Sequence, residues 1–588
     1  MTEPTDDLPA DARVRLVDAR RLTGPNLLSR SPLVIVELAI DDGEDRARAR
    51  EAYLGELGRL RAALGLSAAV EWLERPHRGG TVVGYAASID VMLPCAEMSE
   101  WAALSACAIA AGRAPLALEP KRADIEAMLA ASRSPRLSAL AGEAGRRGVP
   151  LLWDDAAVSL GLGARSACWT RDALPAADAV PWESLGRIPI ALVTGTNGKT
   201  TTTRLLARMG REAGRRVGAT SSDAITIGAE VIDEGDWTGP AAARVVLRRA
   251  DVDLAVLETA RGGILRRGLA VDDCDVALVT NISDDHVGGY GIDDLDAMAR
   301  AKGVTLDALL PSGTAVLNAR DPRLVELARG RPRVVFFADL EAGGPETEAA
   351  RLVVERHRAS GQDVVLAAGG RVVHARGETE TSIADVAAIP IAFGGAARFN
   401  VENALGATGA ALALGLPAEA IARALEGFNA DENPRRSVLV ERGGVSVVLD
   451  FGHNVEGVRA VMRLVASLRG EPPSGSLTVI AGSSGDRSDR EIAGVARVIR
   501  EAGADRVLVR ELSDYLRGRV PGEVPAVFRR ALGELGLAPD AIEVAESEVD
   551  ALRRALATAR PGDFIVLLVH VDEHDVRALL AGSGARLA

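Results

Sequence analysis

Residues 188–204 read IPIALVTGTNGKTTTTR, and this stretch decides how the rest of the sequence is interpreted. The apolar run 188–193 predicts a buried strand. The run leads into a loop bounded by glycines, T-G-T-N-G-K-T at 194–200, and a helical pattern follows. A strand, a glycine-bounded loop and a Lys-Thr pair at a helix start are the layout of a phosphate-binding loop.

Each part of this loop has a physical role in holding a phosphate chain. Glycines let backbone N–H groups approach phosphate oxygens, and the helix N-terminus adds partial positive charge. Lys199 neutralises phosphate charge, and the Thr200 hydroxyl is a ligand for Mg²⁺. The loop is shorter than the general G-x-x-x-x-G-K-[ST] motif because position 193 is valine. The loop residues expected to bind ATP are Gly195, Thr196, Asn197, Gly198, Lys199, Thr200 and Thr201.

The bulk properties of the chain favour a cytoplasmic protein of several domains. The 588 residues are too many for one core, which predicts about three or four domains. The net charge of −13 and the absence of a long basic run argue against nucleic acid or an anionic membrane as a partner. No apolar run reaches the roughly 20 residues that span a bilayer. The four cysteines are scattered, which argues against a disulfide framework or a zinc ribbon.

Polar residues follow several strand-like runs in the part of the chain after the phosphate loop. Glu258 ends the apolar run VDLAVLE, and Asn281 and His286 follow the run that begins at Cys274. Alternating strands and helices predict a doubly wound sheet, in which function collects at the carboxyl ends of the strands. An acid at such a strand end suits a Mg²⁺ ligand facing the phosphate loop. A second series of strands and helices after residue 433 predicts a small Rossmann-like domain.

Several of these motifs together resemble the Mur ligase superfamily, and in particular the cyanophycin synthetases. The similar stretches are T-G-T-N-G-K-T-T at 194–201, LETARGGILRRGL at 257–269, N-I-x-x-D-H at 281–286, R-F-N-x-x-N-A at 398–404 and G-D-R-x-D at 485–489. The run R-x-L-x-G-P-N-x-x-S at 20–29 resembles the opening of the cyanophycin synthetase N-terminal domain. In that family the domain supports assembly and helps to hold the polymer; a plain oligomerisation scaffold is the alternative.

The resemblance implies an α/β multidomain fold. We expect a small α+β N-terminal domain at 1–142, a central Mur-ligase domain with the phosphate loop in a doubly wound sheet at 185–432, and a Rossmann-like C-terminal domain at 433–588. Residues 143–184 resemble the entry to the ATP-grasp domain of cyanophycin synthetases, yet the chain reaches the phosphate loop almost at once. We therefore expect a linker there and no ATP-grasp body, so the polymerase activity is not carried over.

The resemblance also assigns metal and nucleotide roles. Thr200 and Glu258 would hold one Mg²⁺ and His286 a second. Lys302, on an expected helix over 293–309, is either an ordinary surface lysine or a carbamylated metal ligand, as in many Mur ligases. A bare ammonium beside two Mg²⁺ ions and phosphates would repel the metals. Asn318 would contact adenine, although Arg320 stands where the family has aspartate in N-A-D-D-P.

Residues near the expected hinge between the central and C-terminal domains complete the expected site. Arg436, or its neighbour Arg435, would reach the γ-phosphate when the domains close, and Asp450 would orient an arginine or the ribose. The catalytic set is then Lys199, His286, Lys302 and Arg436. The residues expected to contact substrate are Arg261, Asn400, Asn403, His453, Asp486, Arg487 and Asp489.

These assignments predict an ATP-dependent ligase that forms ADP, phosphate and an amide through an acyl phosphate. The resemblance suggests arginine as the amine and an aspartyl or similar peptide as the carboxylate, a homo-oligomer, and a partner ligase for the ATP-grasp step. One alternative is an amidating ligase that takes ammonia from a glutaminase partner; that branch carries a cysteine ribbon, which this sequence lacks. The other is a nucleotide-binding assembly subunit without catalysis, which the set Lys199, Thr200, Glu258, His286 and Lys302 disfavours.

Overall fold

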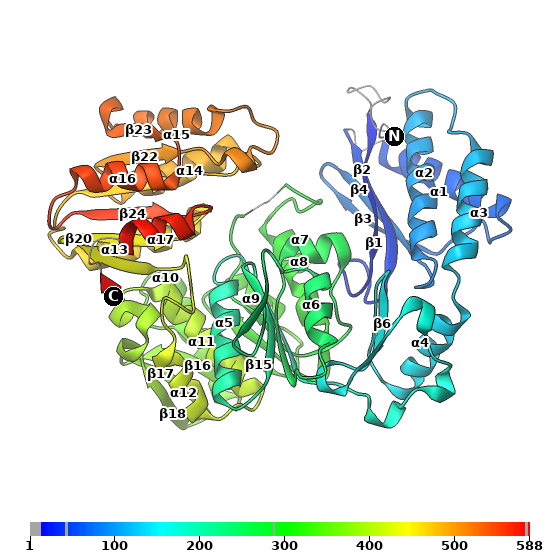
Figure 1. The fold of residues 1–588 in the computed structure, drawn as a ribbon, viewed down its shortest axis with the longest axis horizontal. Coiled ribbons are helices and arrows are strands. Elements are labelled where there is room, and N and C mark those ends of the chain that lie inside the picture. The colour runs from blue at the N-terminus through cyan, green and yellow to red at the C-terminus, as the bar shows by residue number, and fades with distance from the viewer. Residues whose placement is uncertain (1–12, 42–44, 286–287, 582–585, 588) are drawn as a thin grey trace.

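The computed structural model describes residues 13–41, 45–285, 288–581 and 586–587. Their strands form sheets of four, three, eleven and seven strands. Figure 1 shows the eleven-stranded sheet and its helices at the base, with the N-terminal sheet on one side above it and the seven-stranded sheet on the other. The expected α/β multidomain fold is therefore confirmed. In the described residues, no helix is both long and apolar enough to cross a membrane.

The N-terminal part is an antiparallel sheet in the order β1-β2-β4-β3, covered on one face by helices. Its core includes Tyr53 and Met98 from the helices and Val36 and Tyr85 from the strands. The bounds are β1 Val14–Leu22, β2 Leu33–Ile40, α1 Asp45–Ala63, β3 Trp72–His77, β4 Gly80–Ala86, α2 Met92–Ala110, α3 Leu118–Ser132 and α4 Pro135–Arg147.

The segment expected to be a linker contains a small antiparallel sheet. Its strands are β5 Leu151–Trp153, β6 Ala157–Leu160 and β7 Ala167–Thr170. Trp153, Val158 and Leu160 belong to the same buried cluster as the N-terminal helices. This segment is thus packed against the N-terminal core, and the domain division given above stays a prediction.

The central sheet is parallel in the middle and antiparallel at both edges. Its order is β11-β10-β9-β12-β8-β13-β14-β15-β16-β17-β18, and the neighbours from β9 to β16 in this order are parallel. The strands are β8 Ile190–Thr194, β9 Val217–Thr220, β10 Ala224–Ile227, β11 Glu230–Glu234, β12 Leu254–Glu258, β13 Cys274–Val279, β14 Leu309–Asn318, β15 Val334–Asp339, β16 Asp363–Ala368, β17 Arg371–Arg376 and β18 Thr379–Asp385.

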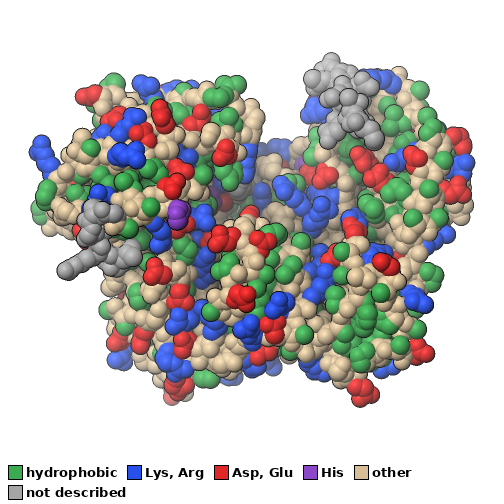
Figure 2. All heavy atoms as spheres, viewed as in Figure 1, with side chains coloured by type: hydrophobic (Ala, Val, Ile, Leu, Met, Phe, Trp, Pro, Cys, Tyr) green, Lys and Arg blue, Asp and Glu red, His purple; other side chains and the backbone are tan. Residues whose placement is uncertain are grey.

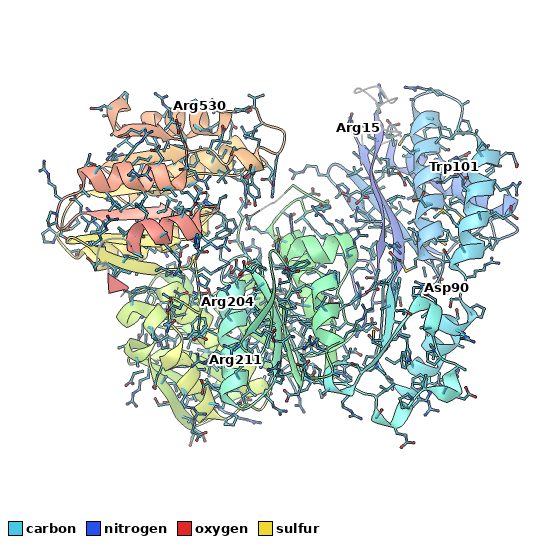
Figure 3. The ribbon with its side chains drawn as sticks, in the orientation of Figure 1. Arg15, Asp90, Trp101, Arg204, Arg211 and Arg530 are labelled. Atoms are coloured by element: carbon cyan, nitrogen blue, oxygen red, sulfur yellow. The ribbon has the colours of Figure 1, made fainter. Side chains whose placement is uncertain are left out.

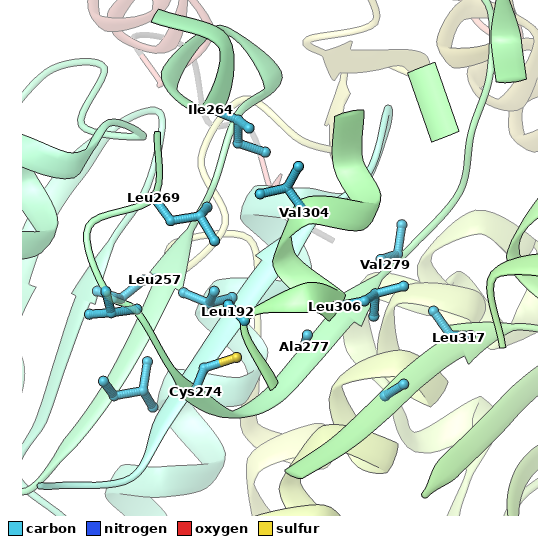
Figure 4. Close-up of a cluster of buried hydrophobic side chains, with 14 of the residues drawn as sticks. Leu192, Leu257, Ile264, Leu269, Cys274, Ala277, Val279, Val304, Leu306 and Leu317 are labelled. Carbon is cyan, nitrogen blue, oxygen red and sulfur yellow. The ribbon is translucent and has the colours of Figure 1, made fainter. Parts of the chain in front are cut away.

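Helices cover both faces of this sheet. Successive strand residues point to opposite faces, and apolar residues on each face pack against a different set of helices. Leu192 faces a cluster with α6, α7, α8, α9 and α10, whereas Val193 faces α5, α11 and α12. Figure 4 shows the first cluster, in which Leu192 and Leu257 of the sheet lie below Ile264 and Val304. The helices are α5 Lys199–Glu212, α6 Pro240–Leu247, α7 Arg261–Arg267, α8 Leu295–Asp307, α9 Pro322–Leu327, α10 Pro345–Ala359, α11 Arg398–Ala413 and α12 Ala418–Gly427.

The C-terminal part is a second α/β unit whose sheet has the order β23-β22-β21-β24-β20-β19-β25. Helices α13, α14 and α15 pack on one face and α16 and α17 on the other. The bounds are β19 Val438–Arg442, β20 Val445–Asp450, α13 Val455–Arg469, β21 Leu477–Ala481, α14 Asp489–Glu501, β22 Arg506–Arg510, α15 Glu523–Glu534, β23 Ile542–Ala545, α16 Glu548–Thr558, β24 Phe564–Leu568, α17 Glu573–Ala581 and β25 Arg586–Leu587.

The turn at 20–29 attaches the N-terminal sheet to the end of α7. Asn26 closes the turn on itself, since its Oδ1 accepts from two backbone N–H groups and its Nδ2 donates to the Gly24 carbonyl. A Cβ at Gly24 would lie 2.2 Å from the carbonyl oxygen of Leu269, so only glycine fits this contact. The guanidinium of Arg20 donates to the Leu265 carbonyl and pairs with buried Glu37 at 2.9 Å. This motif therefore joins two parts of the fold.

Candidate functional site

The phosphate loop follows the central strand β8 and leads into α5, as the sequence predicts. Gly198, at the N-cap of α5, has φ 82°, and a Cβ there would lie 2.0 Å from the Asn403 side-chain oxygen. No side chain caps the first turn of α5 among the described residues, so its N–H groups remain available to an anion. The ammonium of Lys199 donates to the Thr196 carbonyl at 2.9 Å, within its own loop.

Glu258 and Thr200 lie together beneath this loop. Glu258 ends β12 and is 2% exposed; its Oε2 accepts from the Ser222 backbone N–H at 3.1 Å. Within the part of the chain that the structure describes, its Oε1 has no hydrogen-bond partner. Burial raises the pKa of Glu258, while the nearby Lys199 ammonium lowers it. The Thr200 hydroxyl lies 2.8 Å from the Ser222 hydroxyl.

This arrangement fits Mg²⁺ bound between protein and phosphate. Within the described residues, no group of three His, Cys, Asp or Glu side chains is placed to hold a metal ion. Mg²⁺ is usually held by one or two carboxylates plus the phosphates of a substrate, and it keeps several waters. The second oxygen of Glu258 would be such a carboxylate ligand, and the Thr200 hydroxyl would add a further oxygen. His286, predicted to hold a second ion, lies outside the described residues.

Lys302 reaches the phosphate loop from α8. It is 4% exposed, and its ammonium donates to the Gly195 carbonyl at 2.6 Å. Burial lowers the pKa of Lys302 well below its usual range, and the neighbouring charge of Lys199 lowers it further. The structure thus buries Lys302 against the loop rather than placing it on the surface.

A cavity of about 1100 Å³ lies between the central and C-terminal sheets. Most residues predicted to bind ATP, metal or substrate line it, from both sides. They are Thr196, Asn197, Gly198, Lys199, Thr200, Thr201, Glu258, Arg261, Lys302, Asn400, Asn403, Arg436, Asp450, His453 and Asp486.

Two amide side chains connect the phosphate loop to the C-terminal domain. Asn454 donates to the Asn197 oxygen at 2.9 Å, and Asn197 donates back to the Asn454 oxygen at 3.3 Å. Asn454 also caps α13 by accepting from the Gly457 N–H. This reciprocal pair fixes the position of the phosphate loop relative to the facing C-terminal domain.

Asp223 connects three arginines at the hinge, and it was not predicted from the sequence. Its carboxylate pairs with Arg436 at 2.6 Å, Arg204 at 2.8 Å and Arg435 at 3.4 Å. Arg204, labelled in Figure 3, comes from α5. These arginines outweigh burial and hold the pKa of Asp223 below its usual value. Asp223 follows the end of parallel strand β9, so the rule that found Glu258 could have found it as well.

Asp450 lines the cavity, but its carboxylate is already engaged. One oxygen accepts from the backbone N–H and hydroxyl of Ser437, and the other from the Gly452 N–H at 2.8 Å. Ser437 has a positive φ of 56°, so Asp450 fixes a strained backbone position just before β19. Burial raises the pKa of Asp450. A nucleotide or substrate contact of Asp450 stays a prediction.

Four predicted residues that the structure describes do not line the cavity, namely Gly195, Asn318, Arg487 and Asp489. The amide of Asn318 donates to the Thr280 carbonyl and the Glu402 carboxylate, and its oxygen accepts from the Arg320 N–H. Arg487 pairs across the cleft with Asp285. Asp489 begins α14 and is half exposed, where it pairs with Arg519 and Arg530. Glu402, which bonds both Asn318 and Arg320, lines the cavity and was not predicted.

Comparison with known protein families confirms the class of protein that the fold and the site indicate. Residues 193–411 match the family model described as Mur ligase middle domain, and residues 435–568 match that described as Mur ligase, glutamate ligase domain. Together the two models cover more than half of the chain, which therefore belongs to the Mur ligase superfamily.

Within that superfamily the chain is similar to cyanophycin synthetases. It is 38% identical over 385 residues to that of Synechocystis sp., covering 65% of this chain and 42% of the relative. The chain thus spans about two fifths of the length of the cyanophycin synthetases it matches. It is also 28% identical over 407 residues to the UDP-N-acetylmuramoyl-L-alanyl-D-glutamate--2,6-diaminopimelate ligase of Geobacter metallireducens, covering 65% of this chain and 73% of that one.

Solved structures of a ligase and a synthase align with about two thirds of this chain. A pseudomurein peptide ligase type C from Methanothermus fervidus aligns over 68% of this chain and 82% of its own, with 18% identity and a TM-score of 0.47. A bifunctional folylpolyglutamate synthase/dihydrofolate synthase from Yersinia pestis aligns over 66% and 88%, with 20% identity and a TM-score of 0.48.

Proposed function

We propose that this protein is an ATP-dependent ligase that joins a carboxylate to an amine and releases ADP and phosphate. One observation carries the proposal. Lys199, Glu258 and Lys302, from three different elements, converge beneath a cavity that the C-terminal domain closes with Arg436. Membership of a superfamily of amide-forming ligases supports the same chemistry.

The carboxylate must first be activated, because direct attack by an amine would have to expel an oxide ion from it. A carboxylate oxygen attacks the γ-phosphorus of ATP and ADP leaves, giving an acyl phosphate. The amine nitrogen then attacks the carbonyl carbon, phosphate leaves with its bridging oxygen, and the nitrogen loses a proton. Lys199 and Arg436 would neutralise phosphate charge, and closure of the C-terminal domain would exclude water. Mg²⁺ held by Thr200 and Glu258 would supply further neutralisation of phosphate charge.

The amine in this proposal is an amino acid, with arginine the first candidate, and the carboxylate belongs to an aspartyl or similar peptide. The similarity to cyanophycin synthetases supports this choice. His453 and Asp486 of the C-terminal domain line the cavity, where a carboxylate suits a cationic amino acid. Assembly as a homo-oligomer and a partner ligase for an ATP-grasp step belong to the same proposal.

The test is release of phosphate from ATP and Mg²⁺ over a matrix of acceptors and amino acids, with product masses measured in parallel. We expect release with an aspartyl acceptor plus arginine, and a product heavier by one residue. Release with another carboxylate and amine would keep the ligase chemistry and change its substrates. Phosphate release that requires ammonia as the amine, and not an amino acid, would favour the amidating ligase. ATP binding without phosphate release would favour the non-catalytic subunit.

We further propose that Lys302 is carbamylated and that its carbamate contributes to the metal site. The buried ammonium of Lys302 lies beside the phosphate loop and near the like charge of Lys199, which is unfavourable for an unmodified lysine. Addition of the neutral amine to CO₂, with loss of one proton, replaces the cation by a carboxylate-like ligand.

Restoring bicarbonate to protein prepared free of CO₂ should therefore raise the rate of ADP formation. The expected increase is about tenfold, the size of effect typical of groups that support a metal site. Steady-state ADP release measures it, and a Lys302→Arg variant, which cannot form the carbamate, serves as the matched control. Equal rates with and without bicarbonate would contradict the carbamate.

A further inference from the structure

The cavity extends beyond the reacting groups to a wall formed by α6 and α7. Arg244 of α6 and Arg266 and Arg267 of α7 line it together with the phosphate loop. Figure 2 shows Lys and Arg side chains gathered in the hollow between the two upper parts of the molecule. These three arginines, called here the arginine wall, have no role in the chemistry proposed above.

Arg244 is a buried cation with an unused donor. It is 8% exposed, and its Nη2 donates to the Thr23 hydroxyl at 2.7 Å. Among the described residues its Nε has no hydrogen-bond partner. Burial lowers the pKa of Arg244, and the two carboxylates nearby, Asp154 and Asp155, are already paired with Arg248 and Arg21. A buried guanidinium without its own carboxylate is unfavourable unless a ligand supplies the anion.

The other two arginines are exposed and line the same cavity as Arg244. The Thr23 backbone N–H donates to the Arg267 carbonyl at 2.7 Å, so Thr23 contacts both α6 and α7. Arg266 donates to the Tyr290 hydroxyl and lies 5.1 Å from the ring centre. Arg267 is near enough to Asp155 to lower the pKa of that carboxyl, but the closer partner of Asp155 is Arg21, at 2.8 Å.

The two acidic residues of the cavity nearest the C-terminal domain cleft pair with other arginines, and Asp236, before α6, accepts from the Thr238 hydroxyl. Asp285 pairs with Arg487, and Asp486 with Arg517 of the C-terminal domain. Because the whole chain carries a net charge of −13, general electrostatics would repel an acidic ligand. A local group of three arginines is therefore a specific feature of this cavity.

We propose that the arginine wall binds additional carboxylates of the acceptor, so the acceptor class is a peptide with two or more acidic groups. The inference rests on the proposed ligase function and names its substrate class. The reacting carboxylate would lie by Lys199, and neighbouring carboxylates would pair with Arg244, Arg266 and Arg267 at the far end of the same cavity. Guanidinium groups suit this task because they bind carboxylates with two parallel hydrogen bonds.

Direct binding tests this without requiring turnover. Fluorescein-labelled tetra-aspartate is titrated with the full chain and followed by fluorescence anisotropy, with tetra-asparagine and tetra-phosphoserine peptides in parallel. We expect tetra-aspartate to bind more tightly than both other peptides. An Arg266→Gln/Arg267→Gln double variant should weaken its binding by about tenfold or more, because two partly desolvated ion pairs are lost.

The control is an Arg329→Gln/Arg351→Gln variant, which removes the same charge from exposed positions just after α9 and on α10. It should leave tetra-aspartate binding unchanged. Equal binding of tetra-asparagine, stronger binding of the phosphopeptide, or an unaffected Arg266→Gln/Arg267→Gln variant would each overturn the proposal. The chain could bind tetra-aspartate through these arginines yet never form ADP. That result would contradict the ligase function and still support the binding site.

Discussion

Replacing Lys199 by alanine should lower acceptor-dependent ADP formation by about a thousandfold, because a preorganised charge at the transferring phosphate is lost. Lys199 lines the cavity at the start of α5, where no other described ammonium except that of Lys302 faces the loop. The measurement is ADP release at saturating ATP, acceptor and amine.

The fold should survive this change. The Lys199 ammonium donates to the carbonyl of Thr196 in its own loop, so its removal breaks no hydrogen bond to another element of the described residues. A Lys121→Ala variant is the matched control, since Lys121 pairs with Glu97 in the N-terminal part, far along the chain from the loop. Full turnover by the Lys199 variant would contradict the assignment of the ATP site.

Replacing Asp223 by asparagine should lower kcat and also destabilise the protein. One carboxylate pairs with Arg204, Arg435 and Arg436. Arg435 also pairs with Glu573 at 2.8 Å, so removal of Asp223 leaves Arg204 and Arg436 without a carboxylate partner in the described residues. Burial lowers the pKa of Arg204 to about 10, and the Asp223 carboxylate opposes that lowering. Breaking a buried ion pair typically costs about 3 kcal/mol or more of unfolding free energy.

The loss of activity should exceed the loss of folded protein. Arg436 lines the cavity and is oriented by Asp223, so kcat per folded molecule should fall by about a hundredfold while the KM for ATP changes little. Denaturant unfolding and initial rates give the two quantities separately. An Asp251→Asn variant removes an exposed carboxylate that also pairs with two arginines, Arg216 and Arg249, and should change neither. An unchanged kcat per folded molecule in the Asp223 variant would mean that Asp223 has a structural role only.

Strand ends account for most of what the sequence revealed about the site. Glu258 and the phosphate loop lie where a parallel sheet places the ends of its strands, so local periodicity and the order of elements sufficed. Lys302 was found through the resemblance, and its position on α8 agrees with the expected helix over 293–309.

Features that depend on contacts distant in sequence were not predictable in the same way. Arg244 enters the cavity wall because Thr23, more than two hundred residues earlier, fixes its guanidinium. Asn318 ends its strand as expected, yet its amide is used by neighbours that only the fold brings together. The sheet in the segment expected to be a linker was missed because β5, β6 and β7 have only three or four residues each, too few for a clear period.

The turn at 20–29 ties the N-terminal sheet to the helix that carries two arginines of the cavity wall. Because Arg20 donates to the Leu265 carbonyl and Thr23 to the Arg267 carbonyl, these parts share hydrogen bonds to the backbone of α7 and cannot separate without leaving buried groups unpaired. We therefore expect the N-terminal part and α7 to unfold together. A ligand that shifts the N-terminal sheet would alter the acceptor end of the cavity directly, and removing the sheet would disorder that end rather than leave an autonomous catalytic core.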